Sequence, residues 1–249
     1  MITNLTPDTW RDLQTEVGRI LEQCGFSVEI EKKAATARGR VELDVYAEET
    51  IKGRKYSIAC ECKHWKANVP QTIIHGFRTV VSDLGCNIGY IITTSDFQSG
   101  SLAASEMTNV ELMTWENFQN KFFESWYEEY FSPSIAKELD PILTYSEPIL
   151  PKWFSKMTSE EKDTYYELKD KYDAFGWIVM MFTPYARMVG NKEIPTLPLI
   201  SRLRVTDDLK KNIPTKILNE TGYKQFMEHC IEFGNIAISE FRVLRDKYI

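Results

Sequence analysis

The stretch VELDVYAEETIKGRKYSIACECKHW, residues 41–65, decides the fold of this 249-residue chain. Its two ends alternate between apolar and polar residues, as half-buried β-strands do, and the polar TIKGRKY segment between them is typical of a turn. Side chains alternate between the two faces of a strand. We therefore expect Cys60 to point into the core, and Ala59, Glu61 and Lys63 to lie on the opposite face.

A pair of carboxylates follows if the two strands pair antiparallel, because Asp44 on the first then lies near Glu61 on the second. Neighbouring carboxylates repel each other unless a cation lies between them, and oxygen ligands without His or Cys favour Mg²⁺ or Mn²⁺. The amine of Lys63 can position or help deprotonate an attacking water, and can neutralise charge on a phosphate. This set of groups suits metal-assisted phosphodiester hydrolysis.

The elements around the strand pair predict an α/β fold with a mixed sheet flanked by helices. Before it, residues 6–26 have a helical apolar spacing, with Thr6 or Asp8 as the cap. After it, Pro70 marks the start of a helix that Gly85 ends. The other predicted elements are a strand over 26–31, a strand over 87–94, a short helix over 99–107, a strand over 110–115 and a helix over 116–131.

The composition changes after the last of these helices. Four closely spaced prolines predict a linker or irregular wrap at about 132–152. Beyond it, Thr158 and Glu161 have the spacing of a capping box, and an amphipathic helix ends the chain. We expect two domains, an α/β domain over 1–131 and a mostly α-helical domain over 132–249.

The overall composition is 43% hydrophobic and 27% charged, as in a soluble globular protein. No apolar run approaches the ~20 residues that cross a bilayer, so we expect no membrane association. The five cysteines have no CxxC spacing, which favours a reducing cytoplasm and argues against a zinc site. The net charge of −6 does not by itself indicate a nucleic-acid binder.

Basic side chains nevertheless gather around the strand pair, and such a group can hold a polyanion on a net-negative protein. The alternative is that they are the solvated charges of surface loops. Gln71, His75 and Arg78 share one face of a predicted helix and can line a cleft or simply meet solvent. The gathered residues are Lys32, Lys33, Arg38 and Arg40 before the pair, Lys52, Arg54 and Lys55 in its turn, and Lys63 and Lys66 after it.

Two motifs in the opening stretch resemble those of the PD-(D/E)xK nucleases. The segment ELD ends at the first acid, Asp44, and the segment ECK supplies Glu61 and Lys63. Leu43 stands where the motif has proline, a position at which the family pattern tolerates change. The surroundings, ECKHW leading to VPQ, then GYIITTSDF and VELMTWENF, resemble the Mrr-like branch of restriction endonucleases over residues 10–120.

This resemblance implies a restriction-endonuclease-like fold and a Mg²⁺-dependent endonuclease acting on DNA, with Mn²⁺ as a substitute. Asp44 and Glu61 would bind the metal, and Lys63 would orient or activate water. Glu16 on the early helix and Gln71 would assist. The candidate DNA contacts are Lys32, Lys33, Arg38, Arg40, His75 and Arg78.

Because cutting two strands takes two active sites, the resemblance also implies a homodimer, or a partner protein bound by residues 132–249. Its implied role is bacterial restriction or anti-phage defence. Two alternatives stay open: a repair or junction-resolving nuclease, and a catalytically silent module that binds a partner protein. The intact set of Asp44, Glu61 and Lys63 argues against the silent module.

Simpler structural roles also exist for several of these residues. Asp44 could cap a turn, and Glu61 could pair with Lys63 at the surface. Glu16 could be a solvated helix carboxylate. Trp65, at the exit of the second strand, either stacks on a base or packs beneath a loop, and we expect packing.

Overall fold

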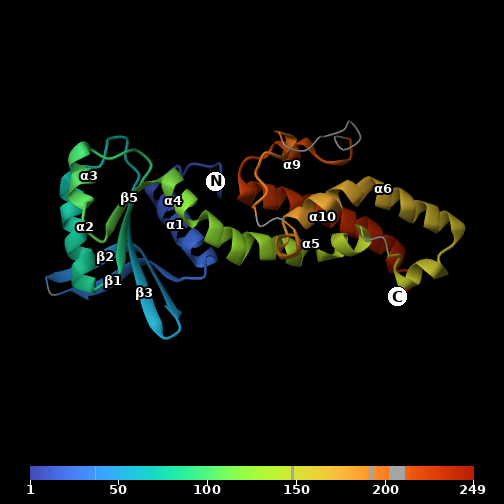
Figure 1. The fold of residues 1–249 in the computed structure, drawn as a ribbon, viewed down its shortest axis with the longest axis horizontal. Helices are drawn as coiled ribbons and strands as arrows, with labels where there is room; N and C mark the ends of the chain where they lie inside the picture. The colour runs from blue at the N-terminus through green and yellow to red at the C-terminus, as the bar shows by residue number, and fades with distance from the viewer. Residues whose placement is uncertain (37, 147–148, 191–192, 202–210) are drawn as a thin grey trace. The chain divides into compact units, whose positions relative to one another are not determined.

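The computed structural model describes residues 1–36, 38–146, 149–190, 193–201 and 211–249 (Figure 1). It divides into two compact units, Met1–Glu129 and Tyr130–Ile249. In the described residues, no helix has the length and apolar character needed to span a membrane.

The first unit is built on a five-stranded mixed sheet with strand order β1-β2-β3-β4-β5. The first three strands pair antiparallel, and β3, β4 and β5 are parallel. The predicted α/β fold and the antiparallel pairing of the opening stretch are therefore confirmed. The strands are β1 (Ser27–Thr36), β2 (Gly39–Ile51), β3 (Arg54–Lys63), β4 (Ile88–Thr93) and β5 (Val110–Thr114).

Helices cover both faces of this sheet, with α1 and α4 on one side and α2 and α3 on the other (Figure 1). Ala59, expected on the face opposite Cys60, is fully buried in a cluster with Ile74 and Phe77 of α2, so this face of β3 is also covered. The crossover between parallel strands places a helix over that face. The helices are α1 (Trp10–Gln23), α2 (Gln71–Leu84), α3 (Ser99–Ser105) and α4 (Trp115–Trp126).

The ends of the first two helices follow from local chemistry. Helix α1 is capped by Thr9 and not by Thr6 or Asp8, because Thr9 and Asp12 form a reciprocal capping box. Helix α2 follows Pro70 and ends at a left-handed Gly85, as predicted.

The second unit is helical, as predicted, and its three long helices contact one another. They are α5 (Ser132–Ser146), α6 (Ser159–Met181) and α10 (Tyr223–Arg245). Its shorter elements are the 3₁₀ turns Lys152–Lys156 and Leu199–Ser201 and the helices α7 (Pro184–Val189) and α9 (Thr215–Asn219). The π-helical turn Tyr127–Phe131 spans the division between the units along the chain.

The linker predicted at about 132–152 is mostly helix α5 instead, while residues 147–148 lie outside the described residues. Pro133 lies just after the π-helical turn Tyr127–Phe131, where the α-helical hydrogen-bond pattern is already interrupted. Pro141 lies inside the helix and removes one hydrogen bond. Burial of apolar side chains such as Leu139, which is 0% exposed, outweighs that loss.

We predict that residues 1–129 fold without the rest of the chain, because the sheet and its flanking helices are complete within that range. The fragment ends before Phe131, whose ring packs against Tyr223 and Phe226 of the second unit. Circular dichroism and a cooperative thermal transition test this. A fragment that is insoluble alone, and is rescued only by co-expression of residues 130–249, would show one cooperative unit.

Candidate active site

Strand pairing brings together the three residues of the two motifs. The carboxylate of Asp44 on β2 accepts the backbone N–H of Cys62 on β3, with 2.6 Å between Oδ2 and N. The neighbours of Cys62 in the chain are Glu61 and Lys63, and their side chains pair with 2.5 Å between Oε1 and Nζ. Two carboxylates and one ammonium therefore meet where β3 ends.

Burial controls the charge of Asp44. Burial first, and repulsion from Glu61 second, raise the pKa of this carboxyl from 3.8 to about 6. The Cys62 N–H, the Lys63 ammonium and a hydrogen bond from Trp10 act in the opposite direction and only partly offset these effects. Ionising Asp44 beside Glu61 is therefore less favourable than ionising a free aspartate.

The donor set fits a hard divalent cation. Mg²⁺ is commonly bound by one or two carboxylates and keeps several waters. Asp44 and Glu61 supply such a pair, and a cation beside them would relieve the repulsion that raises the pKa of Asp44. In the part of the chain that the structure describes, no group of three or more His, Cys, Asp or Glu side chains is placed to hold a metal ion.

The sequence prediction missed the contacts from α1 that hold this end of the sheet. The indole N–H of Trp10 donates to the Cys62 carbonyl at 3.1 Å. The amide of Gln14, one turn later, donates to the Asp44 carbonyl at 2.8 Å. Gln14 is almost fully buried. A glutamine on the apolar stripe of a helix is the signal that could have identified this contact, because a buried amide needs a partner.

Trp65, in the loop after β3, does not pack as expected. Trp65 is 41% exposed and is not packed beneath a loop. Its ring centroid lies 5.5 Å from Nζ of Lys63. Residues 65–68 are all exposed, which explains why the indole finds no apolar cover. On the other side, Thr93 of β4 donates its hydroxyl to the Lys63 carbonyl at 3.0 Å and fixes that backbone.

The two predicted assisting residues have other contacts. Glu16 lies on α1 and forms an ion pair with Arg19, one turn later. Gln71 begins α2, and its side chain is directed to α3: a Cβ added to Gly100 would lie 2.5 Å from Oε1 of Gln71.

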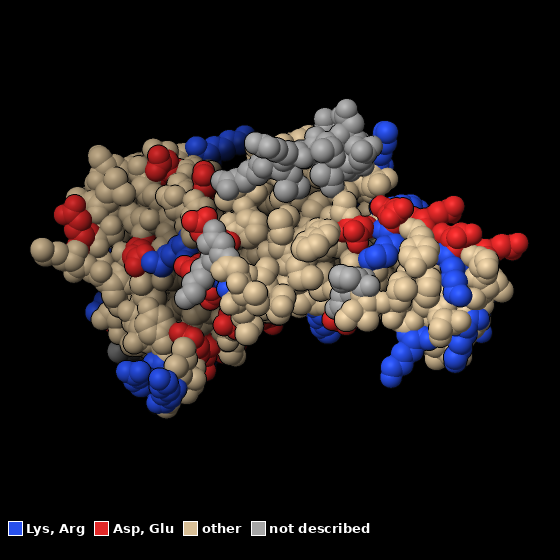
Figure 2. All heavy atoms as spheres, turned by 45° about the vertical axis from the view of Figure 1, so that its right-hand side comes forward, with Lys and Arg blue, Asp and Glu red and all other residues tan. Residues whose placement is uncertain are grey.

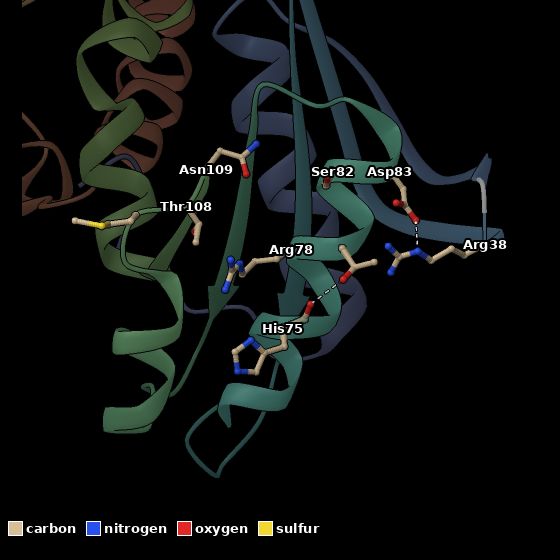
Figure 3. Close-up of a pocket in the computed structure, with 9 residues that line it drawn as sticks. Arg38, His75, Arg78, Ser82, Asp83, Thr108 and Asn109 are labelled. Carbon is tan, nitrogen blue, oxygen red and sulfur yellow. Dashed lines mark hydrogen bonds and ion pairs between the residues drawn. The ribbon is translucent and has the colours of Figure 1, made fainter.

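The six predicted DNA contacts do not form one basic face. On the face drawn in Figure 2, Lys and Arg are mixed with Asp and Glu. Arg38, His75 and Arg78 line one hollow, together with polar residues of α2 and of the loop before β5 (Figure 3). Lys33 and Arg40 line another hollow. The remaining residue, Lys32, forms an ion pair with Glu29, and its Nζ lies 3.7 Å from the ring centroid of Tyr46.

Part of the charge in the first hollow is already engaged. Nε of Arg38 lies 3.6 Å from the carboxylate of Asp83. One guanidinium nitrogen of Arg78 donates to the Ala104 carbonyl at 3.2 Å. The ring of His75 extends from α2 at the edge of the hollow (Figure 3).

Comparison with known proteins points to one family. Residues 8–122 match the Mrr_cat family, described as a restriction endonuclease. A solved structure described as "Crystal Structure of Protein of Unknown Function AF1548" is similar over 73% of this chain and 98% of that chain, with 18% identity and a TM-score of 0.39. No curated protein matches the sequence. The family match includes Asp44, Glu61 and Lys63.

We predict that Asp44→Asn stabilises the metal-free protein at neutral pH. The pKa of Asp44 is about 6 in the folded protein and 3.8 in the unfolded chain. The free energy of unfolding is therefore unaffected by this group below pH 3.8 and falls as the pH rises from 3.8 to about 6. Above pH 6 it is lower by roughly 3 kcal/mol. Asparagine keeps an oxygen for the Cys62 N–H without the charge.

Thermal unfolding in a chelator measures this effect. The Tm of Asp44→Asn should exceed that of the wild type at about pH 7.5, and the difference should narrow as the pH falls towards about 4. A wild-type Tm that is higher at neutral pH would contradict an unfavourable buried charge at Asp44.

Proposed function

We propose, from the membership of residues 8–122 in the Mrr-like restriction endonuclease branch of the PD-(D/E)xK nucleases, that this chain is a Mg²⁺-dependent endonuclease that cuts DNA. One observation supports this above all. The Asp44 carboxylate is bound to the N–H of Cys62, between the paired side chains of Glu61 and Lys63.

Each of the three residues has a chemical role in this proposal. Asp44 and Glu61 would hold the cation, with Mn²⁺ able to replace Mg²⁺. The bound ion would polarise the phosphate and lower the pKa of a coordinated water. Lys63 orients the attacking water and neutralises charge that develops on the phosphate. The ion pair between Lys63 and Glu61 supports this role, because it puts the ammonium beside a carboxylate that would bind the metal.

The assisting and DNA-binding roles are proposed from where these residues lie in the fold. Glu16, on the helix that contacts the site, and Gln71, at the start of α2, would assist catalysis. The hollow lined by Arg38, His75 and Arg78 offers hydrogen-bond donors to DNA phosphates. Lys32, Lys33 and Arg40 on the neighbouring hairpin would add to this attraction.

The biological role that fits best is restriction or anti-phage defence in a bacterial cytoplasm. The protein would act as a homodimer, since each chain carries one copy of the site, or with a partner bound by residues 132–249. A repair or junction-resolving nuclease would use the same chemistry. A silent module is disfavoured, because Asp44, Glu61 and Lys63 keep both their identity and their mutual contacts.

We predict that Asp44→Asn and Glu61→Gln each abolish Mg²⁺-dependent plasmid nicking without unfolding the protein, because each removes a charged ligand and preserves the side-chain shape. The loss should be roughly 10³-fold or more. Circular dichroism checks the fold. Glu22→Gln, an exposed carboxylate on α1, is the matched control and should nick normally. Full activity in either site variant would remove this active-site assignment.

We also predict that Lys63→Ala lowers turnover by roughly 10²-fold or more while the metal concentration at half-activity changes little, because the amine acts on water and phosphate. Lys63→Arg should remain poor, since a planar guanidinium does not replace a compact ammonium at a tight site. Metal titrations of nicking rate separate the two parameters. Wild-type rates for Lys63→Arg would show that a diffuse positive charge is enough.

A further inference from the structure

The β2–β3 hairpin ends in an exposed basic tip. Its two-residue turn, Lys52 and Gly53, joins the last ladder pair, Ile51 and Arg54. Residues 51–56, here called the tip, are all exposed. Figure 2 shows a group of Lys and Arg side chains at the lower left, where this hairpin ends.

The tip carries positive charge that the protein leaves largely uncompensated. Lys55 pairs with Glu48, with 2.6 Å between Nζ and Oε2. Among the described residues, no carboxylate lies within ion-pair distance of Lys52 or Arg54. The chain as a whole has a net charge of −6. A local excess of positive charge on such a protein marks a place that can attract a polyanion.

The backbone of the turn is unfavourable for the residue it carries. Lys52 has φ +50° and Gly53 has φ +77°. Two positive φ values correspond to a type I′ turn, whose first central position favours Asn, Asp or Gly. A lysine in the left-handed region is strained, and such strain is concentrated at functional positions. Lys52 makes no packing contact that would explain it, since it is exposed.

The tip lies at a fixed distance from the candidate active site. Seven residue steps separate Asp44 from Ile51 along β2, and seven separate Arg54 from Glu61 along β3. At ~3.3 Å per residue this is roughly 23 Å. DNA rises ~3.4 Å per base pair, so the same span covers about seven base pairs of duplex.

We propose that the tip binds the phosphate backbone of duplex DNA about seven base pairs from the phosphate that is cut, with Lys52 and Arg54 as the contacts. This inference rests on the proposed nuclease function and adds a second anchoring point to it. The rigidity of a duplex is what allows one end of the hairpin to hold the backbone while the other end meets the scissile phosphate.

The test uses Lys52→Asn and Arg54→Gln in the full-length protein, with Lys152→Gln plus Lys156→Gln, two exposed lysines of the second unit, as the matched control. Fluorescence anisotropy with a labelled duplex is measured in a chelator, so that the DNA stays intact. Each tip variant should bind roughly 5- to 10-fold more weakly at about 0.1 M salt, and the slope of log K against log salt should fall by roughly 0.9. The control should match the wild type.

Lys52→Asn separates DNA binding from stability, because asparagine tolerates the left-handed backbone and lacks the charge. Its Tm should rise by roughly 2 °C or more while its affinity falls. A destabilised variant with weaker binding would instead reflect damage to the hairpin, and would overturn the assignment of Lys52 as a contact.

Duplex length tests the distance. The ratio of wild-type to variant affinity should fall towards one when the duplex extends only about four base pairs on either side of the cut phosphate. It should reach its largest value when each side extends about twelve base pairs. A loss that does not depend on length, or unchanged binding by both variants, would overturn the proposal; an acidic protein partner would then account for the tip. A wild type that neither binds nor nicks DNA would instead refute the proposed function.

Discussion

The hydrogen bond from the Cys62 N–H to the carboxylate of Asp44 is the contact on which the site depends. It joins β2 to β3 through a side chain just beyond the last regular ladder pair of the two strands. Because Cys62 lies between Glu61 and Lys63, fixing its backbone also fixes where those two side chains leave the strand. A one-residue slip in register would turn both to the opposite face, so the sheet register is also the register of the site.

The same arrangement disfavours the ionised form of Asp44 when no cation is bound. Burial and the charge of Glu61 raise the pKa of Asp44, and the nearby donors only partly compensate. Most of the restraint falls on the backbone, where Trp10 and Gln14 bind the carbonyls of Cys62 and Asp44. The carboxylates of Asp44 and Glu61 keep oxygens that could bind the proposed cation, while their main chain is held in place. This division between a fixed backbone and available side-chain oxygens is what a preorganised metal site requires.

Local patterns in the sequence identified the parts of the fold that have local causes. The period-two alternation around Asp44 and Glu61 predicted the hairpin, and the Pro70 start and Gly85 end of α2 were predicted from backbone preferences. Tertiary effects were missed. Helix α5 forms through proline-rich sequence because its apolar face is buried, and Trp10 reaches β3 only through the packing of α1 on the sheet. The roles of the site residues remain predictions, since geometry alone does not establish them.

Electrostatics limits how such a protein can hold DNA. With a net charge of −6, its affinity has to come from a few positions where cations are available. In the hollow beside α2, Arg38 faces Asp83 and Arg78 already donates to a carbonyl, so part of their hydrogen-bonding capacity is engaged. Lys52 and Arg54 have no such engagement among the described residues, and Lys52 keeps its place in a turn better suited to asparagine or glycine. A residue that is unfavourable for its backbone conformation and gains no packing contact indicates a functional position. For Lys52, that function would be to present its ammonium to DNA.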